Sequence, residues 1–537
     1  MRRSLSVVLL SVLAGAFTAH GQPASPSLRD GPNLNTPNDI GKNEQEKPGV
    51  LVQDIVFKGA RSIPETALDA AVAPFINTKI DKDDLKKIAN ALTKTYFDEG
   101  YFLSQATIKP QEIVNGVLIV DMVEGALSTV RINGADDHAL TRYFESALNE
   151  KPAQRRTFER ALTLIKGLPG YRVEKRSLQK DPSALGQFVF DLTISLKQAM
   201  AQLDATNKGV RAGTAWRGLV SGELRSVYRA GDRLQIGALS KPGALSELTY
   251  GFGRYQTPVG GRGLVAFVEG VASNSNPRSA LVGRDLNGSL RSFGLGVNYP
   301  VVQTRRSQLS VSSRFDWVNS TEFEDGDRLY ADRMRIGRLS AQYARPAGRN
   351  GRALFFLQTS QGLNVFNASV REGVSTSRPD ADGQFLKFDG RAVVQKFVTD
   401  RISVSGSVIG QFATGPLLFL EEFAFGGGLY GRGYDFGEII GDNGVAGFGE
   451  VGYHGGAIGL VDRWEVYSFG DIGAVWNKGQ GLSIDGDPLY SAGAGVRVTL
   501  ADYVFLNYEA AYPIADAPFT EKDDHARHRL QVTLTYQ

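Results

Sequence analysis

The stretch that decides the fold lies near the C-terminus, where residues 491–512 read SAGAGVRVTLADYVFLNYEAAY. Apolar side chains alternate with small or polar ones in two successive runs. Successive side chains of a β-strand point to opposite faces of a sheet, so each run predicts a strand with one apolar face. A strand between lipid and a wet barrel interior has this pattern. The apolar positions are Ala492, Ala494, Val496, Val498 and Leu500, then Val504, Leu506, Tyr508, Ala510 and Tyr512.

The same alternation continues through the C-terminal two-thirds of the chain, from about Leu203 to the run ending at Tyr536. Two kinds of connection separate the runs. Long polar connections are expected at 274–287, 319–332 and 370–384, and short turns at 229–232 and 347–351. Short turns at one end and long loops at the other are typical of an outer-membrane β-barrel. A soluble β-sandwich or propeller would also alternate, but the long strands and unequal connections favour the barrel.

The N-terminus has the features of a targeting signal followed by a linker. Residues 1–21 combine a basic start, a short apolar core and small residues before Gln22, which indicates a secretory signal peptide. The apolar core is shorter than the roughly 20 residues of a membrane-spanning helix. Residues 22–50 are rich in Pro and poor in large apolar residues, so we expect a mobile linker.

Two small α+β units are expected between the linker and the barrel, at 51–125 and 126–200. In the first, the spacing of Leu85, Ile88 and Leu92 predicts a helix that begins after Asp81 and ends at Gly100. Strands precede and follow it, which gives the order β-α-α-β-β. The second unit repeats this order, with its strong helix at 154–166 and its last strands near 171–178 and 187–196. Such a repeat indicates a tandem array.

These units resemble a known family. The run from Asn90 to Tyr101, followed by Pro110-Gln111 and Val123-Glu124-Gly125, is similar to the first polypeptide-transport-associated (POTRA) domain of two-partner secretion transporters. Residues 158–170 resemble the second POTRA domain of the same transporters. They form the TpsB class, the secretion-activation family of hemolysins and filamentous hemagglutinins.

The resemblance extends into the barrel through Gly231-Asp232-Arg233-Leu234 and Tyr299-Pro300. It implies an α+β periplasmic part with two tandem POTRA domains, followed by a transmembrane antiparallel β-barrel of sixteen strands at 201–537. Residues 203–537 number 335, so sixteen strands have about 21 residues each with their connections. This is ample, since a spanning strand needs about 9–11.

One Gly-rich segment carries the candidate site. Residues 421–434 read EEFAFGGGLYGRGY, and their Gly-x-Gly-x-x-Gly spacing alone could suggest dinucleotide binding. That motif requires a helix after it, and a polar Gly-rich loop follows instead. The segment is similar to the arginine-bearing tip of the sixth extracellular loop in this transporter superfamily, which folds back into the barrel. The family often has Val or Ile where this chain has Gly431.

A second element, residues 469–473 (FGDIG), resembles the F-x-D-x-G strand of the superfamily. The resemblance implies that Arg432 pairs with Asp471 on the inner barrel wall. A guanidinium can grip one carboxylate through two parallel hydrogen bonds, and a partly dry interior strengthens such a pair. The expected translocation-motif residues are Gly431, Arg432, Gly433, Tyr434, Phe469, Asp471 and Gly473.

Composition and motifs argue against other classes. The chain has no Cys, five His and a net charge of +3, which gives no reason to expect a nucleic-acid partner. It has no G-x-S-x-G, H-E-x-x-H or P-loop motif, so we expect no enzyme and no catalytic, cofactor-binding or metal-binding residues. Asp325-Gly-Asp327 lacks the ligand spacing of a calcium loop and fits a hairpin tip.

The resemblance implies an outer-membrane translocator that binds an unfolded partner exoprotein through periplasmic POTRA domains and exports it without nucleotide hydrolysis. The partner would be a TpsA-like hemolysin, hemagglutinin or adhesin. Outer-membrane lipid, the barrel-assembly machinery and periplasmic chaperones would be further partners. The alternatives are a factor that inserts other barrels, a passive porin, a barrel-borne hydrolase and a surface adhesin.

Overall fold

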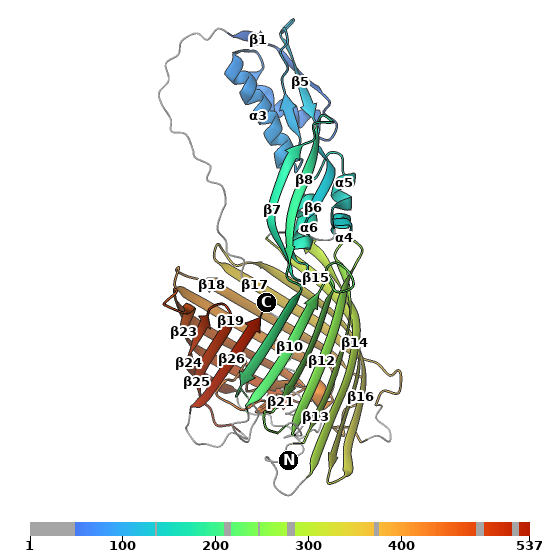
Figure 1. The fold of residues 1–537 in the computed structure, drawn as a ribbon, viewed down its shortest axis with the longest axis vertical. Helices are drawn as coiled ribbons and strands as arrows, with labels where there is room; N and C mark the ends of the chain where they lie inside the picture. Colours follow the sequence, from blue (N-terminus) through green and yellow to red (C-terminus); the bar gives the residue numbers. More distant parts are fainter. Residues whose placement is uncertain are drawn as a thin grey trace. The chain divides into compact units, whose positions relative to one another are not determined.

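The computed structural model describes residues 49–134, 137–208, 216–244, 247–276, 285–304, 306–369, 375–478, 488–517 and 526–536 (Figure 1). The expected signal peptide at 1–21 and all but the end of the expected linker at 22–50 lie outside these residues. The chain forms two compact units, an α+β unit that ends at Leu196 and a barrel unit that includes everything from Lys197.

The first POTRA domain is built around one amphipathic helix, α3 (Lys82–Asp98). Asp81 caps it by accepting hydrogen bonds from the backbone N–H groups of Asp83 and Asp84, and the Asp81 N–H donates to the Asp84 carboxylate. Its apolar face packs on a sheet of order β2-β5-β4, and a short β1-β3 pair completes the domain. The other elements are β1 (Val50–Val52), β2 (Asp54–Lys58), α2 (Glu65–Val72), η1 (Ala73–Phe75), β3 (Thr78–Ile80), β4 (Gln105–Thr107) and β5 (Val117–Val123).

The second POTRA domain repeats this plan. Its sheet has the order β6-β8-β7, with β6 parallel to β8 and β7 antiparallel to it. The elements are β6 (Ala126–Asn133), α4 (Asp137–Thr141), η2 (Arg142–Phe144), α5 (Glu145–Asn149), α6 (Arg155–Lys166), β7 (Tyr171–Lys180) and β8 (Gln187–Leu196). None of the helices in the described part of the chain is long and apolar enough to cross a membrane.

The C-terminal unit is a closed antiparallel barrel of sixteen strands, which confirms the predicted fold class (Figure 1). Consecutive strands pair throughout, and β26 pairs with β9 to close the sheet. The strands are β9 (Ala199–Thr206), β10 (Arg217–Arg225), β11 (Arg233–Ser240), β12 (Leu248–Val259), β13 (Leu264–Ser275), β14 (Leu286–Gln303), β15 (Gln308–Glu324), β16 (Asp327–Pro346), β17 (Gly351–Gly362), β18 (Leu386–Phe397), β19 (Ile402–Ala413), β22 (Asn443–Gly455), β23 (Val461–Trp476), β24 (Leu489–Leu500), β25 (Val504–Pro513) and β26 (Arg527–Tyr536).

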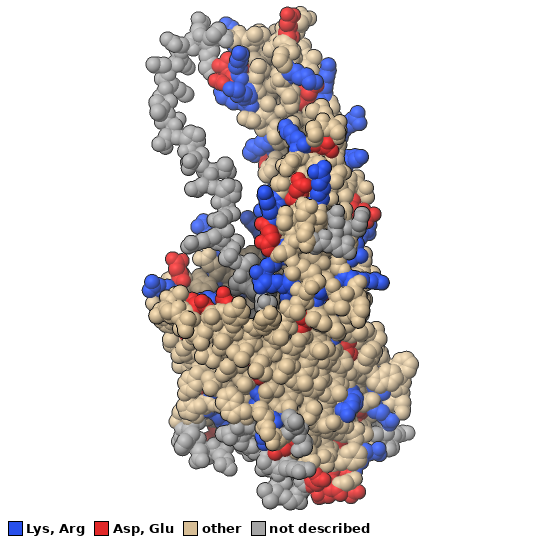
Figure 2. All heavy atoms as spheres, in the orientation of Figure 1, with Lys and Arg blue, Asp and Glu red and all other residues tan. Residues whose placement is uncertain are grey.

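The alternation in residues 491–512 sorts side chains between the two barrel faces. Tyr508 and Tyr512 on β25 are 45% and 46% exposed on the outer face, whereas Asn507 and Glu509 are 5% and 2% exposed on the inner face. The visible outer face has a central band with few charged side chains, and most Lys, Arg, Asp and Glu lie towards its two ends (Figure 2). The barrel therefore has the lipid-facing band that an outer-membrane protein requires.

The expected polar loop at 319–332 is wrong. Strands β15 and β16 continue through it and meet at a two-residue turn, Asp325-Gly326. Both turn residues have positive φ, 52° and 91°, as the tight hairpin turn favoured by Asp-Gly requires. The many polar side chains made the segment look like a loop, although they lie on strands that extend past their neighbours.

One expected boundary also needs correction, because the barrel sheet begins at Ala199 rather than at 201. Two of the five His residues lie on barrel strands. His454 is in β22, and its ring forms a 2.7 Å hydrogen bond with the Ser403 hydroxyl. His528 is in β26.

Candidate functional site

The segment between β19 and β22 returns into the barrel and packs against its inner wall. It includes the short helix η3 (Phe419–Glu421) and two short paired strands, β20 (Phe423–Phe425) and β21 (Ile439–Gly441). Residues 417–427 and 432–436 are almost all buried. We call residues 414–442 the inner loop. It contacts inward-facing side chains of strands on both sides of the barrel.

Arg432 and Asp471 are brought together at the tip of the inner loop. The Arg432 Nη2 donates to Asp471 Oδ1 at 2.8 Å, and its Nε lies 3.1 Å from the same oxygen. The backbone N–H of Arg432 donates to Asp471 Oδ2 at 2.8 Å, and the Ser491 hydroxyl donates to that oxygen at 3.0 Å. Arg432 is 3% exposed and Asp471 4%. Removing either charge would leave the other buried and uncompensated, which costs about 3–5 kcal/mol.

The guanidinium of Arg432 also packs against two aromatic rings. The Arg432 Cζ lies 3.4 Å from the centroid of the Phe469 ring and 5.3 Å from that of Phe448. Phe469 and Asp471 are neighbours on the inner face of β23, one residue apart. The F-x-D spacing therefore presents a ring and a carboxylate to one arginine, because residues i and i+2 of a strand share a face.

The motif glycines allow the chain to approach the wall. A Cβ on Gly433 would lie 2.7 Å from the Cβ of Ser491, so no side chain fits there. A Cβ on Gly473 would lie 2.1 Å from the ring of Phe425, which rests directly on the β23 backbone. Gly431 has a positive φ of 76°, which an L-residue rarely adopts.

Tyr434 fixes the far side of the tip. It is fully buried, and its hydroxyl donates to the Tyr490 carbonyl at 2.7 Å and accepts from the Ala515 N–H at 3.0 Å. Arg529 on β26 donates to the carbonyls of Gly427 and Tyr434 at 2.9 and 2.8 Å. The tip thus bridges β23, β24 and the closing strand β26.

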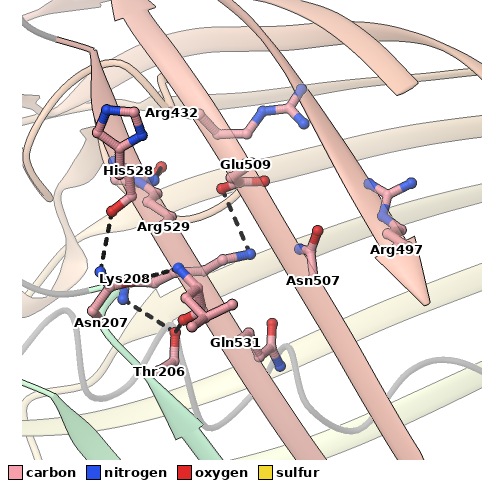
Figure 3. Close-up of polar contacts among 12 residues, drawn as sticks. Thr206, Asn207, Lys208, Arg432, Arg497, Asn507, Glu509, His528, Arg529 and Gln531 are labelled. Carbon is pink, nitrogen blue, oxygen red and sulfur yellow. Dashed lines mark hydrogen bonds and ion pairs between the residues drawn. The ribbon is translucent and has the colours of Figure 1, made fainter. Parts of the chain in front are cut away.

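A chain of charged groups extends from Arg432 along the inner wall. Glu450 accepts from Arg432 Nη1 at 3.1 Å and from Arg497 Nη1 at 2.6 Å. Farther along, Lys208 lies 3.5 Å from Glu509, beside the seam where β9 meets β26 (Figure 3). At that seam the Asn207 side chain donates to the His528 carbonyl and accepts from the Leu530 N–H.

The base of the inner loop is fixed to the opposite wall. Glu421 pairs with Arg338 of β16 at 2.6 Å and with Lys387 of β18 at 2.9 Å. Arg378 binds both Glu422 and Asp442, at 2.8 and 2.6 Å, and so ties the two ends of the loop together. Ion pairs therefore hold the inner loop at its tip and at its base.

Sequence reasoning predicted the tip pair and missed the base. Glu421 and Glu422 lie inside the quoted motif segment, and two adjacent acids before a Gly-rich run were an available signal. Their partners Arg338, Lys387 and Arg378 carry no local motif, because only the barrel register brings them near. Within the described residues, no group of three or more His, Asp or Glu could hold a metal ion.

Comparisons with known proteins agree with this architecture. The ShlB-type POTRA domain matches residues 50–125, and the haemolysin secretion/activation protein family ShlB/FhaC/HecB matches residues 252–498. The outer membrane transporter CdiB of Escherichia coli is 23% identical, over 90% of this chain and 82% of the relative.

Two solved structures share the fold. CdiB from Escherichia coli aligns with a TM-score of 0.77 at 19% identity, over 100% of this chain and 98% of that chain. CdiB from Acinetobacter baumannii aligns with a TM-score of 0.67 at 17% identity, over 99% and 98%. Together the two family matches span more than half of the sequence. The chain belongs to the ShlB/FhaC/HecB family of haemolysin secretion/activation proteins, the TpsB class of outer-membrane transporters with periplasmic POTRA domains.

Proposed function

We propose that this protein captures an unfolded TpsA-like exoprotein in the periplasm and exports it through the barrel, with no nucleotide hydrolysis. The observation that carries the proposal is the inner loop, held inside the barrel by buried ion pairs at its tip and base. A loop fixed in this way would obstruct free diffusion through the barrel, and export would require its ion pairs to be broken.

Capture would use the edges of the POTRA sheets. Strands β2 and β4 are the edges of the first sheet and β6 and β7 those of the second, as far as the structure describes them. An extended segment can add to such an edge through main-chain hydrogen bonds, whatever its sequence. On β7, Arg172, Lys175 and Arg176 flank the edge with positive charge, which discourages pairing between copies of the chain.

The driving force would come from the exported chain itself. Burial of apolar surface as the exoprotein folds outside opposes its return, so transport needs no nucleotide. The barrel-assembly machinery and periplasmic chaperones would act only while this protein is itself inserted. In this account residues 1–21 are the signal peptide, 22–50 the linker and 51–125 the first POTRA domain. The second POTRA domain follows to Leu196, and the barrel unit begins at Lys197.

Gly431, Arg432, Gly433, Tyr434, Phe469, Asp471 and Gly473 would form the translocation motif. The test is a secretion assay in a strain that lacks the transporter, complemented with wild type, Arg432→Ala or Arg349→Ala. Arg349 lies exposed in the short turn after β16 and serves as the matched control. We expect Arg432→Ala to reduce export at least tenfold while heat-modifiable migration shows a folded barrel, and Arg349→Ala to export normally. Normal export without the transporter, or through a well-expressed Arg432→Ala variant, would refute the proposal.

A further inference from the structure

An open groove of about 420 Å³ crosses the outer face of the barrel, over strands β12 to β15. Its floor is made of Gly251, Gly253, Gly270 and Ala272 on β12 and β13. Phe293 and Trp317 stand in register on β14 and β15, along one edge of this floor. Phe293 is 49% exposed and Trp317 37%, on the face that meets lipid. Arg291 and Asn319 close one end.

The floor glycines have no internal reason to be glycine. A Cβ built on Gly251, Gly253 or Gly270 would meet no atom closer than 3.9 Å. None of the three has a positive φ. Glycine in a strand costs stability relative to residues with side chains, and where packing does not require it, it marks a place where something else approaches the backbone. The missing side chains are what hollow the groove.

The closed end of the groove is positively charged without an acid to balance it. Arg291, Asn319 and Arg333 lie side by side on β14, β15 and β16, in register. Arg291 donates to the carbonyls of Ser273 and Leu290 and to the Asn274 side chain. Arg333 Nε is buried with no hydrogen-bond partner among the described residues. Within those residues, neither arginine has an ion pair.

A third arginine adds to this charge. Arg335 stacks on Trp317, with its Cζ 4.0 Å from the ring centroid, and donates to Asn319 Oδ1 at 3.0 Å. Arginines on the lipid-facing side of a barrel are unfavourable unless they lie near the interface or meet an anion. Arg291 stands five positions from Leu286, where β14 begins at the long-loop end. Long connections lie at the extracellular end of an outer-membrane barrel, so this end faces the outer leaflet.

We propose that this groove binds a phosphorylated lipid of the outer leaflet. An acyl chain lies along the glycine floor of β12 and β13, beside Phe293 and Trp317, and the phosphate is bound by Arg291 and Arg333. Arginine suits this role because its planar fork matches phosphate oxygens with two parallel hydrogen bonds. Basic pockets on membrane proteins recognise anionic headgroups by the same chemistry.

The test measures binding of three probes to the purified full-length protein in neutral detergent: bisphosphorylated lipid A, its dephosphorylated form and inorganic phosphate. We expect lipid A to bind near one equivalent, the dephosphorylated lipid at least tenfold more weakly, and phosphate alone far more weakly than either. Arg291→Gln should weaken lipid A binding about tenfold. Arg345→Gln, an outward arginine at the other end of β16, should not.

The groove is tested separately by filling it. Gly270→Val has room for its Cβ and should weaken both lipids while the barrel folds normally. Gly449→Val is the control, since an added Cβ there meets nothing within 4 Å and β22 lies on the opposite wall. Unchanged lipid A affinity in Arg291→Gln and Gly270→Val would overturn the proposal. So would inorganic phosphate that competes at concentrations similar to lipid A, because the site would then be one for free phosphate.

Discussion

Gly473 shows how a single residue fixes the position of the inner loop. Its missing side chain leaves the space that the ring of Phe425 fills. The ring in turn packs with Tyr434, at a centroid distance of 6.2 Å, two positions from Arg432. A methyl group at residue 473 therefore competes directly with the loop for one volume.

Gly473→Ala should accordingly release the tip of the inner loop and reduce export, with the barrel intact. Because the chain has no Cys, Ala446→Cys provides a clean reporter. Ala446 is 2% exposed in the cluster beneath Phe423 and Phe425, so a thiol there is labelled only when the loop leaves. We expect labelling to rise about tenfold. In the Gly473→Ala background, Phe425→Ala should restore part of the lost export, because it removes the clash. If Gly473→Ala changed neither labelling nor export, the contact between residues 473 and 425 would not be needed.

The candidate site was predictable only where local sequence carries it. Arg432 and Asp471 belong to short motifs whose spacing survives in this chain. Glu421 pairs with Arg338, 83 positions away, and that partner depends on strand register and on the path of the loop. One sequence fixes neither, so the charges at the loop base could be found only in three dimensions.

At the scale of one loop, the Glu421 anchor should matter less than the tip. Glu421→Gln keeps the shape but removes a charge, and Arg338 retains Asp316 at 2.7 Å. We expect loosening of the loop base by about 2 kcal/mol, seen as a modest rise in Ala446→Cys labelling with export reduced less than by Arg432→Ala. If Glu421→Gln reduced export as much as Arg432→Ala, the prediction would be wrong, because the base and the tip of the loop would then be equally important.

In the first POTRA domain, Glu124 links the end of β5 to the chain before α2. Burial opposes its ionisation, but the N–H groups of Arg61 and Ser62, at 2.8 and 2.7 Å, and the Tyr96 hydroxyl, at 3.0 Å, favour the carboxylate. Their sum lowers the pKa of Glu124. This carboxylate belongs to the Val-Glu-Gly run quoted from the sequence, which gives that run a structural role.

A carboxyl group whose pKa is lower in the folded state stabilises the domain at pH values above its unfolded-state pKa. This stabilisation is lost as the pH falls through the folded-state pKa. The free energy of unfolding of the POTRA unit should therefore decrease below about pH 4.3, the ordinary pKa of Glu. Hydrogen exchange of the α3 amides in the full chain, followed from pH 6 to pH 3, measures this decrease in stability. Glu124→Gln should be less stable at pH 6 and lose less on acidification. An equally steep loss in the variant would assign the pH dependence to other groups.

For the whole barrel, closure depends on the seam between β9 and β26. Its six residue pairs are fewer than at the other strand junctions, and the side chain of Asn207 adds two hydrogen bonds (Figure 3). Asn207→Ala should lower the free energy of unfolding by about 2 kcal/mol, seen as a lower temperature of the heat-modifiable shift. Asn350→Ala, in an exposed turn, is the control. An unchanged transition would mean that the main-chain bonds alone close the barrel.

The barrel was predictable because the alternation of apolar and polar side chains is visible within each strand. This alternation reflects the lipid on one face of the strand and the barrel interior on the other, so residues 491–512 were enough to predict the fold class. Strand ends were less predictable, since the β15–β16 hairpin extends past its neighbours with polar side chains that resemble a loop. The strand number of sixteen came from the resemblance, because closure is a property of the whole sheet.

In the proposed export mechanism, Arg432 and Asp471 act together to hold the inner loop in the barrel and release it during export. The most direct test is a double-mutant cycle, with export measured for wild type, Arg432→Ala, Asp471→Ala and the double variant at equal levels of folded barrel. The account predicts that the double variant exports as well as or better than either single one, because no uncompensated charge remains. Losses that multiply would contradict it, since the two residues would then act independently.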